Sequence, residues 1–153
     1  MQRTGFIAAA LCLAASASSA EDARVAPLVA KIYRNFDANG RGLQPLGKDA
    51  KAYFDDSLIR LFKADSKRAG GEVGTIDYNP LCSCQDFDIK NVSFVERSSD
   101  DKTIIVDVTF ENSAAQDGVT LVLSKTKAGL RIFDIGDKQA PSIRKVLSQA
   151  AAN

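Results

Sequence analysis

Two cysteines in the stretch Asn79-Pro80-Leu81-Cys82-Ser83-Cys84 carry the most distinctive chemistry in this chain. One residue separates them, which suits a redox pair, half of a metal site or a disulfide within one loop. A reactive thiolate needs a nearby cation or helix N-terminus, whereas Asp86 and Asp88 follow here and favour the neutral thiol. A structural zinc site needs about four ligands, and the chain has no histidine. We therefore expect a Cys82–Cys84 disulfide, with a pair of buried thiols as the alternative.

A disulfide across a single residue requires a turn. Bridged Cα atoms are about 4.4–6.8 Å apart, and residues i and i+2 of an extended strand lie near or beyond that upper limit. Pro80 and Ser83 favour such a turn. The ring is small, so the chain-entropy model gives only about 1.6 kcal/mol of stabilisation. We expect the bond to shape its loop rather than to stabilise the whole domain.

Four acidic side chains, Asp77, Asp86, Asp88 and Asp134, are candidates for acid–base chemistry or ligand binding. Acids that converge in a pocket act as general acid and base when burial separates their pKa values. Aspartates near Asn, Pro and Gly, however, commonly cap turns and end strands. We assign no catalytic residue and take Asp134, Asp86, Asp88 and Tyr78 as the candidate ligand-binding set.

Asp134 differs from the other candidates because it falls within a predicted strand. Strict alternation puts Asp134 on the same face as Leu130 and Ile132. If that face is the concave side of the sheet, a carboxylate points into the concavity.

The sequence also excludes several kinds of site. Without histidine the chain can form neither a Ser-His-Asp triad nor a Cys-His pair. The segment Gly70-Gly71-Glu72-Val73-Gly74 follows no strand and lacks the Lys-Ser/Thr of a phosphate loop, so it predicts the end of a helix. The aspartates match no calcium-loop spacing. We expect neither a metal nor a cofactor.

The first twenty residues, MQRTGFIAAALCLAASASSA, predict a signal peptide. Arg3 supplies the positive start, Phe6 to Ala15 form a short apolar run, and small residues precede a cleavage site after Ala20, with Ala17 as the alternative. The apolar run is too short to span a bilayer. Residues 21–153 then form a single domain, and we expect a periplasmic or secreted protein.

The charge of the exported chain is balanced. Residues 21–153 hold 19 basic and 19 acidic side chains, since Arg3 is the one charged residue of the signal peptide. Binding to nucleic acid or to a membrane through charge requires a basic excess. We therefore expect no nucleic-acid partner and no stable membrane span.

Hydrophobic periodicity predicts helices followed by strands. Apolar residues at helical spacing indicate helices, and strict alternation after Asp86 indicates strands joined by short links, which favours an antiparallel meander. The strand that begins at Phe87 changes face near Lys90-Asn91, which suggests a bulge. The expected elements are helices 23–36, 48–54 and 56–68, strands 87–96, 103–111, 119–123 and 130–135, and a closing helix 142–149. Helices first and strands afterwards indicate the α+β class.

Two segments resemble known families. The strand Gly129–Ile135, GLRIFDI, together with the order of elements, resembles the nuclear transport factor 2-like fold, although Leu130 stands where an aromatic residue is usual. The segment from Gly70 to Asp88 resembles a bacterial secreted family catalogued as domain of unknown function 3828. The likeness runs from about Val29 to Asp137 and implies helices packed into a curved sheet. It implies no activity.

These observations favour a non-catalytic exported protein that binds a partner through the sheet concavity or the cysteine loop. The alternatives are an inhibitor or immunity protein that binds a partner protein, and a small-molecule enzyme that uses pocket carboxylates. The residues do not distinguish a small-molecule partner from a protein partner, and they indicate no oligomeric state.

Overall fold

The computed structural model describes residues 18–152, so residues 1–17 of the predicted signal peptide lie outside it. In the described part the chain forms three helices, then four strands, then a last helix. In order these are α1 (Ser18–Tyr33), α2 (Ala50–Tyr53), α3 (Asp56–Ala69), β1 (Ile89–Ser99), β2 (Thr103–Asn112), β3 (Ala115–Thr126), β4 (Gly129–Gly136) and α4 (Ile143–Ala150).

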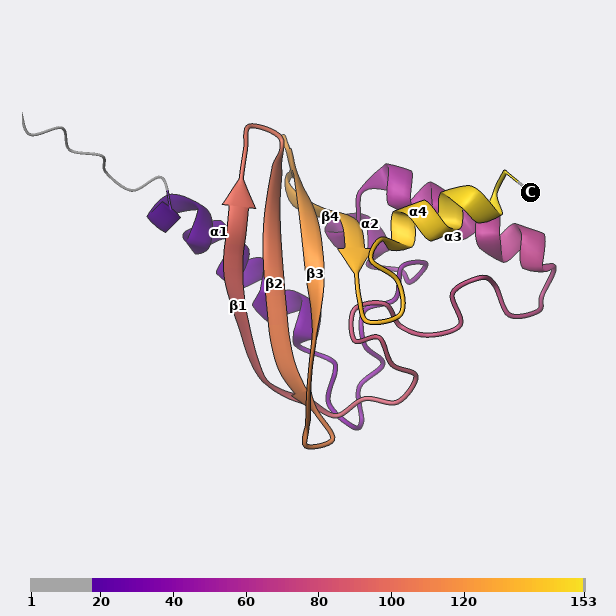
Figure 1. Cartoon of the computed structure of the whole chain (residues 1–153), viewed down its shortest axis with the longest axis horizontal. Helices are drawn as coiled ribbons and strands as arrows, with labels where there is room; N and C mark the ends of the chain where they lie inside the picture. The colour runs from indigo at the N-terminus through magenta and orange to yellow at the C-terminus, as the bar shows by residue number, and fades with distance from the viewer. Residues whose placement is uncertain (1–17, 153) are drawn as a thin grey trace, which may run out of the picture.

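The four strands form one open antiparallel sheet in the order β1-β2-β3-β4. Short turns join neighbouring strands, as a meander requires. Figure 1 shows α1 crossing behind the sheet, whereas α3 and α4 lie together beyond the β4 edge. The predicted α+β class and the meander are confirmed.

The inner face of the sheet is filled by the core. Every second residue of β2, from Ile104 to Phe110, is buried there, and α1 contributes Val25, Val29 and Ile32. The Tyr33 ring packs against Phe110 at 5.6 Å between ring centroids. The concave face therefore closes into a core instead of forming an open pocket.

The first helix ends earlier than its periodicity predicts, at Tyr33 instead of residue 36. Phe36 remains fully buried, but its carbonyl accepts from the Ile89 amide at 2.7 Å. The Asn35 carbonyl accepts from the Gly42 amide at 2.8 Å. These carbonyls bind the following loop and β1 instead of continuing the helix.

Both ends of α3 are as predicted. Asp55 caps the helix by accepting from the Ser57 amide at 2.9 Å. Gly70 ends it with φ +61°, a left-handed conformation that glycine adopts without steric cost.

A bulge in β1 confirms the predicted change of face near Lys90-Asn91. The register with β2 shifts between Lys90 and Ser93, and Asn91 has φ +53°. An extra residue in one strand rotates the following side chains to the other face.

Another bulge, in β4, makes the predicted orientation of Asp134 wrong. Ile132 pairs with Leu123 of β3, but Asp134 pairs with the next residue, Val122, so Phe133 is the extra residue. Strict alternation therefore fails after Ile132, and Asp134 lies on the opposite face from Ile132. Its carboxylate does not point into the inner face.

No helix within residues 18–152 combines the length and the apolar character that crossing a membrane requires.

Candidate ligand-binding groove

The structure contains the predicted disulfide between Cys82 and Cys84, with the Cα atoms 5.1 Å apart. A turn makes this distance possible, because the Cys82 amide donates to the Asn79 carbonyl at 3.2 Å and the Asn79 amide to the Cys84 carbonyl at 2.8 Å. Ser83, between the cysteines, has φ +51°. The bond thus fixes the shape of one loop.

The cysteine loop is part of the core. Leu81, Cys82 and Ser83 are all buried, and the Leu81 carbonyl accepts from the Tyr33 hydroxyl at 2.7 Å. Buried side chains offer no surface to a partner, so this part of the loop is not favoured as a docking site.

Asp134 caps the last helix. Its Oδ2 accepts from the Ser142 hydroxyl at 2.6 Å and its Oδ1 from the Arg144 amide at 2.9 Å. Oδ1 also accepts from the Ile135 amide at 2.8 Å, beside the β4 bulge. These contacts hold the carboxylate in a structural role.

Asp86 and Asp88 lie at the entrance to β1. The Asn112 side chain accepts from the Asp88 amide at 2.9 Å and donates to the Asp86 carbonyl at 3.3 Å. The Asp88 carboxylate pairs with Lys90 at 2.8 Å. Both aspartates therefore help to set the start of the strand.

Tyr78 contacts a different acid. Its hydroxyl donates to Asp137 Oδ1 at 3.4 Å. Burial, and then the charge of Asp137, raise the pKa of Tyr78 well above its ordinary value, so the phenol stays protonated. The contacts of the four predicted ligand-binding residues put them in three separate places, and their role in binding stays a prediction.

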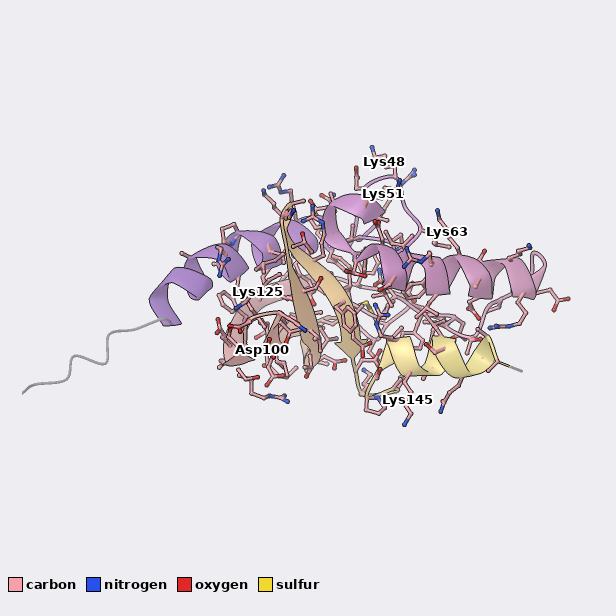
Figure 2. All side chains as sticks on the ribbon, turned by 90° about the horizontal axis from the view of Figure 1, so that it is seen from above. Lys48, Lys51, Lys63, Asp100, Lys125 and Lys145 are labelled. Carbon is pink, nitrogen blue, oxygen red and sulfur yellow. A yellow bond between two sulfur atoms is a disulfide. The ribbon has the colours of Figure 1, made fainter. Side chains whose placement is uncertain are left out.

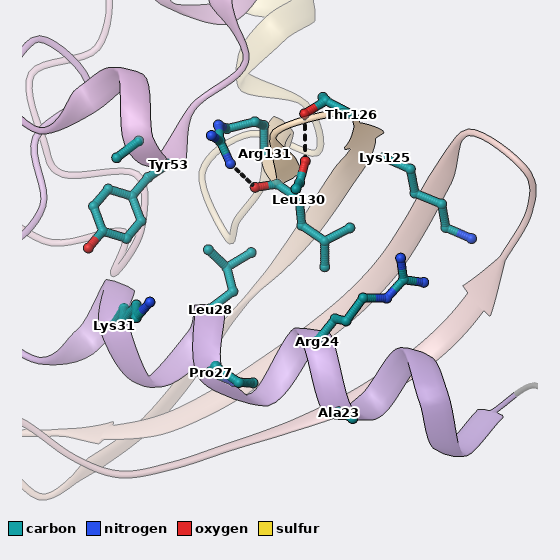
Figure 3. A pocket seen from close by; sticks show the side chains of 12 residues that line it. Ala23, Arg24, Pro27, Leu28, Lys31, Tyr53, Lys125, Thr126, Leu130 and Arg131 are labelled. Atoms are coloured by element: carbon teal, nitrogen blue, oxygen red, sulfur yellow. Dashed lines mark hydrogen bonds between the residues drawn. The ribbon is translucent and has the colours of Figure 1, made fainter.

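A groove lies instead between α1, α2 and the β3–β4 turn, with a volume of about 460 Å³. That volume is within the range of small-molecule sites. Figure 3 shows its lining side chains arranged around the space between the helix and the turn. The lining residues are Ala23, Arg24, Pro27, Leu28 and Lys31 of α1, Ala52 and Tyr53 of α2, and Lys125, Thr126, Gly129, Leu130 and Arg131 of the turn and its flanking strands.

The middle of the groove is apolar. Leu28 of α1 and Leu130 of β4 extend toward each other across it (Figure 3). Leu130 is only 7% exposed and belongs to the core, and Leu28 is half-buried against the same core. An apolar part of a ligand placed here would cover surface that water now contacts.

Four cationic side chains surround this apolar centre: Arg24, Lys31, Lys125 and Arg131. No aspartate or glutamate is found among the described residues that line the groove. Grouped like charges raise the local concentration of oppositely charged ligands. Residues 21–153 hold equal numbers of basic and acidic side chains, so this is a marked local excess of positive charge.

The cations differ in how they are held. Lys125 Nζ donates to the Asp100 carbonyl at 2.6 Å and to Ser99 Oγ at 2.9 Å, beside the β1–β2 turn (Figure 2). Arg131 Nη1 donates to the Leu130 carbonyl at 2.8 Å, which is drawn in Figure 3. Lys31 and the Tyr53 hydroxyl have no hydrogen-bond or ion-pair partner among residues 23–152, so both can bind a ligand without losing a contact.

The groove has chemical groups that can bind a ligand. It offers ammonium and guanidinium groups, a phenol and apolar carbon, and the described residues supply no carboxylate or histidine to it as a general base. An anion with an apolar body matches this combination.

Sequence reasoning did not single out the groove residues. A local signal existed, because Arg24, Leu28 and Lys31 follow one another at i, i+4 and i+7 and so share a face of the helix. The contact of that face with the β3–β4 turn is tertiary, and neither segment alone indicates it.

Comparison with known proteins gives little further information. No family model matches the chain, and no curated protein matches it. A solved structure of a phospholipid-binding protein from Ralstonia solanacearum, in complex with a phospholipid, aligns at 15% identity. The alignment covers 90% of this chain and 87% of that one, with a TM-score of 0.40. A likeness at this level carries no argument about the ligand of this chain.

Proposed function

We propose that this protein is an exported, non-catalytic binding module that holds a small anionic amphiphile in the groove. The observation that carries the proposal is the set of four cations, without a described acid, around the apolar pair Leu28 and Leu130. The predicted signal peptide supports export to the periplasm or beyond the cell. Membership of the secreted family with the nuclear transport factor 2-like fold is part of the same proposal.

The two components of the site have different roles. The apolar pair supplies affinity in proportion to the area it removes from water. The cations select the sign of the charge on the ligand and speed its approach. An amphiphile of the same length that lacks an anionic group, whether non-ionic or cationic, should therefore bind more weakly than an anionic one.

Thermal unfolding with three decyl amphiphiles tests this proposal: decyl phosphate, decyl maltoside and decyltrimethylammonium, each below its critical micelle concentration. We expect decyl phosphate to stabilise the protein, by about 2.7 kcal/mol at a hundred times its Kd. The other two should give little or no stabilisation. Equal effects of all three would contradict a role for the cations.

A matched pair of variants locates the binding. Lys31→Gln removes an exposed, unpartnered cation from the groove, whereas Lys63→Gln removes an exposed lysine of α3 that lies away from it (Figure 2). One exposed charge pair is worth about 0.2–1 kcal/mol. We expect Lys31→Gln to weaken decyl phosphate binding roughly two- to fivefold. Lys63→Gln should leave the affinity unchanged.

A further inference from the structure

A smaller pocket adjoins the groove at Arg131. This side pocket has a volume of about 350 Å³ and shares Thr126 and Arg131 with the groove. Its remaining walls come from Ala128 of the β3–β4 turn and from the end of α2, the link to α3 and the start of α3, which contribute Lys51, Phe54, Asp55 and Asp56. A ligand bound in the groove can therefore extend past Arg131 without leaving the protein surface.

The lining changes along this path from cations alone to a mixture of cations and carboxylates. The described lining of the groove contains cations but no acid, whereas the side pocket adds Asp55 and Asp56 to Lys51 and Arg131. From Leu28 outward, the path offers apolar carbon, then a guanidinium, then carboxylates. Each part suits a different chemical group.

Asp55 is a fixed anion at the end of this path. It accepts from the Ser57 amide at 2.9 Å and from Ser124 Oγ at 3.3 Å, and Arg144 lies 3.9 Å away. Burial opposes its ionisation, but the hydrogen bonds and the charge of Arg144 outweigh burial and lower the pKa of Asp55 below its ordinary value. The carboxylate is therefore charged at neutral pH.

Asp56 is the accessible member of the pair. It is exposed in the first turn of α3 and has no hydrogen-bond or ion-pair partner within residues 23–152. An exposed carboxylate without a partner can pair with a ligand ammonium and lose no protein contact.

We propose that the ligand carries an amine beyond its anionic group, with the apolar chain between Leu28 and Leu130, the anion at Arg131 and the ammonium at Asp56. This inference rests on the proposed function and names the chemistry of its ligand. The shared chemistry is an apolar chain, an anion and then a primary ammonium. An ethanolamine phospholipid headgroup and an acylated basic amino acid both provide it.

The inference predicts that the protein prefers a zwitterion to a net anion, which is the opposite of what net charge alone predicts. A cationic groove alone binds a net anion better than a zwitterion. If the side pocket holds the amine, the zwitterion binds better despite its lower net charge.

Two matched pairs of probes measure this preference by titration calorimetry below the critical micelle concentration. The first pair is lauroyl lysophosphatidylethanolamine and lauroyl lysophosphatidylglycerol, which differ in the amine. The second is Nα-lauroyl-lysine and Nα-lauroyl-norleucine, which also differ in the amine. We expect the amine-bearing member to bind roughly two- to fivefold tighter, the range of one exposed ion pair.

A variant pair connects this preference to Asp56. Asp56→Asn should remove the preference for the amine without weakening lauroyl lysophosphatidylglycerol or Nα-lauroyl-norleucine. Asp101→Asn, which alters an exposed aspartate in the β1–β2 turn, should retain the preference.

The outcomes separate the two proposals. Tighter binding of the amine-bearing probe in both pairs supports the inference for either source of the amine. Tighter binding in one pair alone supports the inference and identifies that source. Equal binding within both pairs, or tighter binding of the amine-free probes, overturns the inference while the proposed function stands. If none of the four probes binds, the proposed function itself fails.

Discussion

Single residues in this protein are placed by contacts that their neighbours in sequence do not indicate. Asp65 is 5% exposed, and its Oδ2 accepts from the Thr75 amide at 2.8 Å while its Oδ1 accepts from Thr75 Oγ1 at 2.6 Å. Arg68 pairs with the same carboxylate. This buried acid therefore holds the glycine-rich loop after α3 in place, a role that hydrogen bonding alone explains.

A substitution at Gly74 tests how closely that loop packs against Asp65. A Cβ at position 74 would overlap with Asp65 Oδ2, so the loop or the carboxylate must move. We expect Gly74→Ala to lower the free energy of unfolding by about 1–3 kcal/mol in urea titrations. Val73→Ala, at a neighbouring side chain that is 73% exposed, should change it by less than about 0.5 kcal/mol. Equal small effects of both substitutions would contradict the close fit.

At the scale of elements, a network at the β4 edge connects α3, β4 and α4. Arg144 of α4 donates to the Phe133 carbonyl at 2.9 Å and to Ser57 Oγ at 2.8 Å, and its guanidinium lies 3.7 Å from the centroid of the Phe133 ring. The Asp55 amide donates to the Ile132 carbonyl at 2.9 Å. Asp55 therefore contributes to this junction through both its backbone and its carboxylate.

The junction makes stability depend on pH through Asp55. Its pKa is lower in the folded state than in the unfolded state, so its contribution is fully present above the ordinary aspartate pKa of about 4 and decreases as the pH falls through the folded value. Asp55→Asn keeps a residue that caps helices well but removes the charge. We expect the difference in unfolding free energy between wild type and this variant to shrink from pH 7 to pH 3.

Urea unfolding at several pH values measures this difference. Asp101→Asn is the matched control, because that carboxylate is exposed and remote from the junction. A wild-type advantage over Asp55→Asn that stays constant below pH 4 would contradict ionic stabilisation by Asp55.

The elements themselves were largely predictable. The four strands follow clear alternation and the helices follow clear periodicity, since burial of one face controls both patterns. The β1 bulge was visible because the pattern itself changes face at Lys90-Asn91. The β4 bulge was not, because Leu130, Ile132 and Asp134 alternate normally and the insertion of Phe133 depends on pairing with β3. That one residue changed the interpretation of Asp134 from a pocket acid to a helix cap.

At the scale of the whole molecule, the groove combines segments that are far apart in the chain. Arg24 and Lys31 precede Lys125 and Arg131 by about a hundred residues, and the fold of the sheet brings them together. The net charge of the chain conceals this grouping, because acids elsewhere balance it. Composition therefore excluded a basic surface overall but could not indicate a local one.

The central claim, that the groove binds an anionic amphiphile, is tested most directly by mapping decyl phosphate onto the folded protein by NMR. We expect saturating ligand to shift the backbone amide signals of Leu28, Lys31 and Gly129 and to leave those of Tyr78 and Asp86 in place. Saturable shifts at Tyr78 and Asp86, with Leu28 and Gly129 unmoved, would contradict the account and return the site to the residues around the cysteine loop.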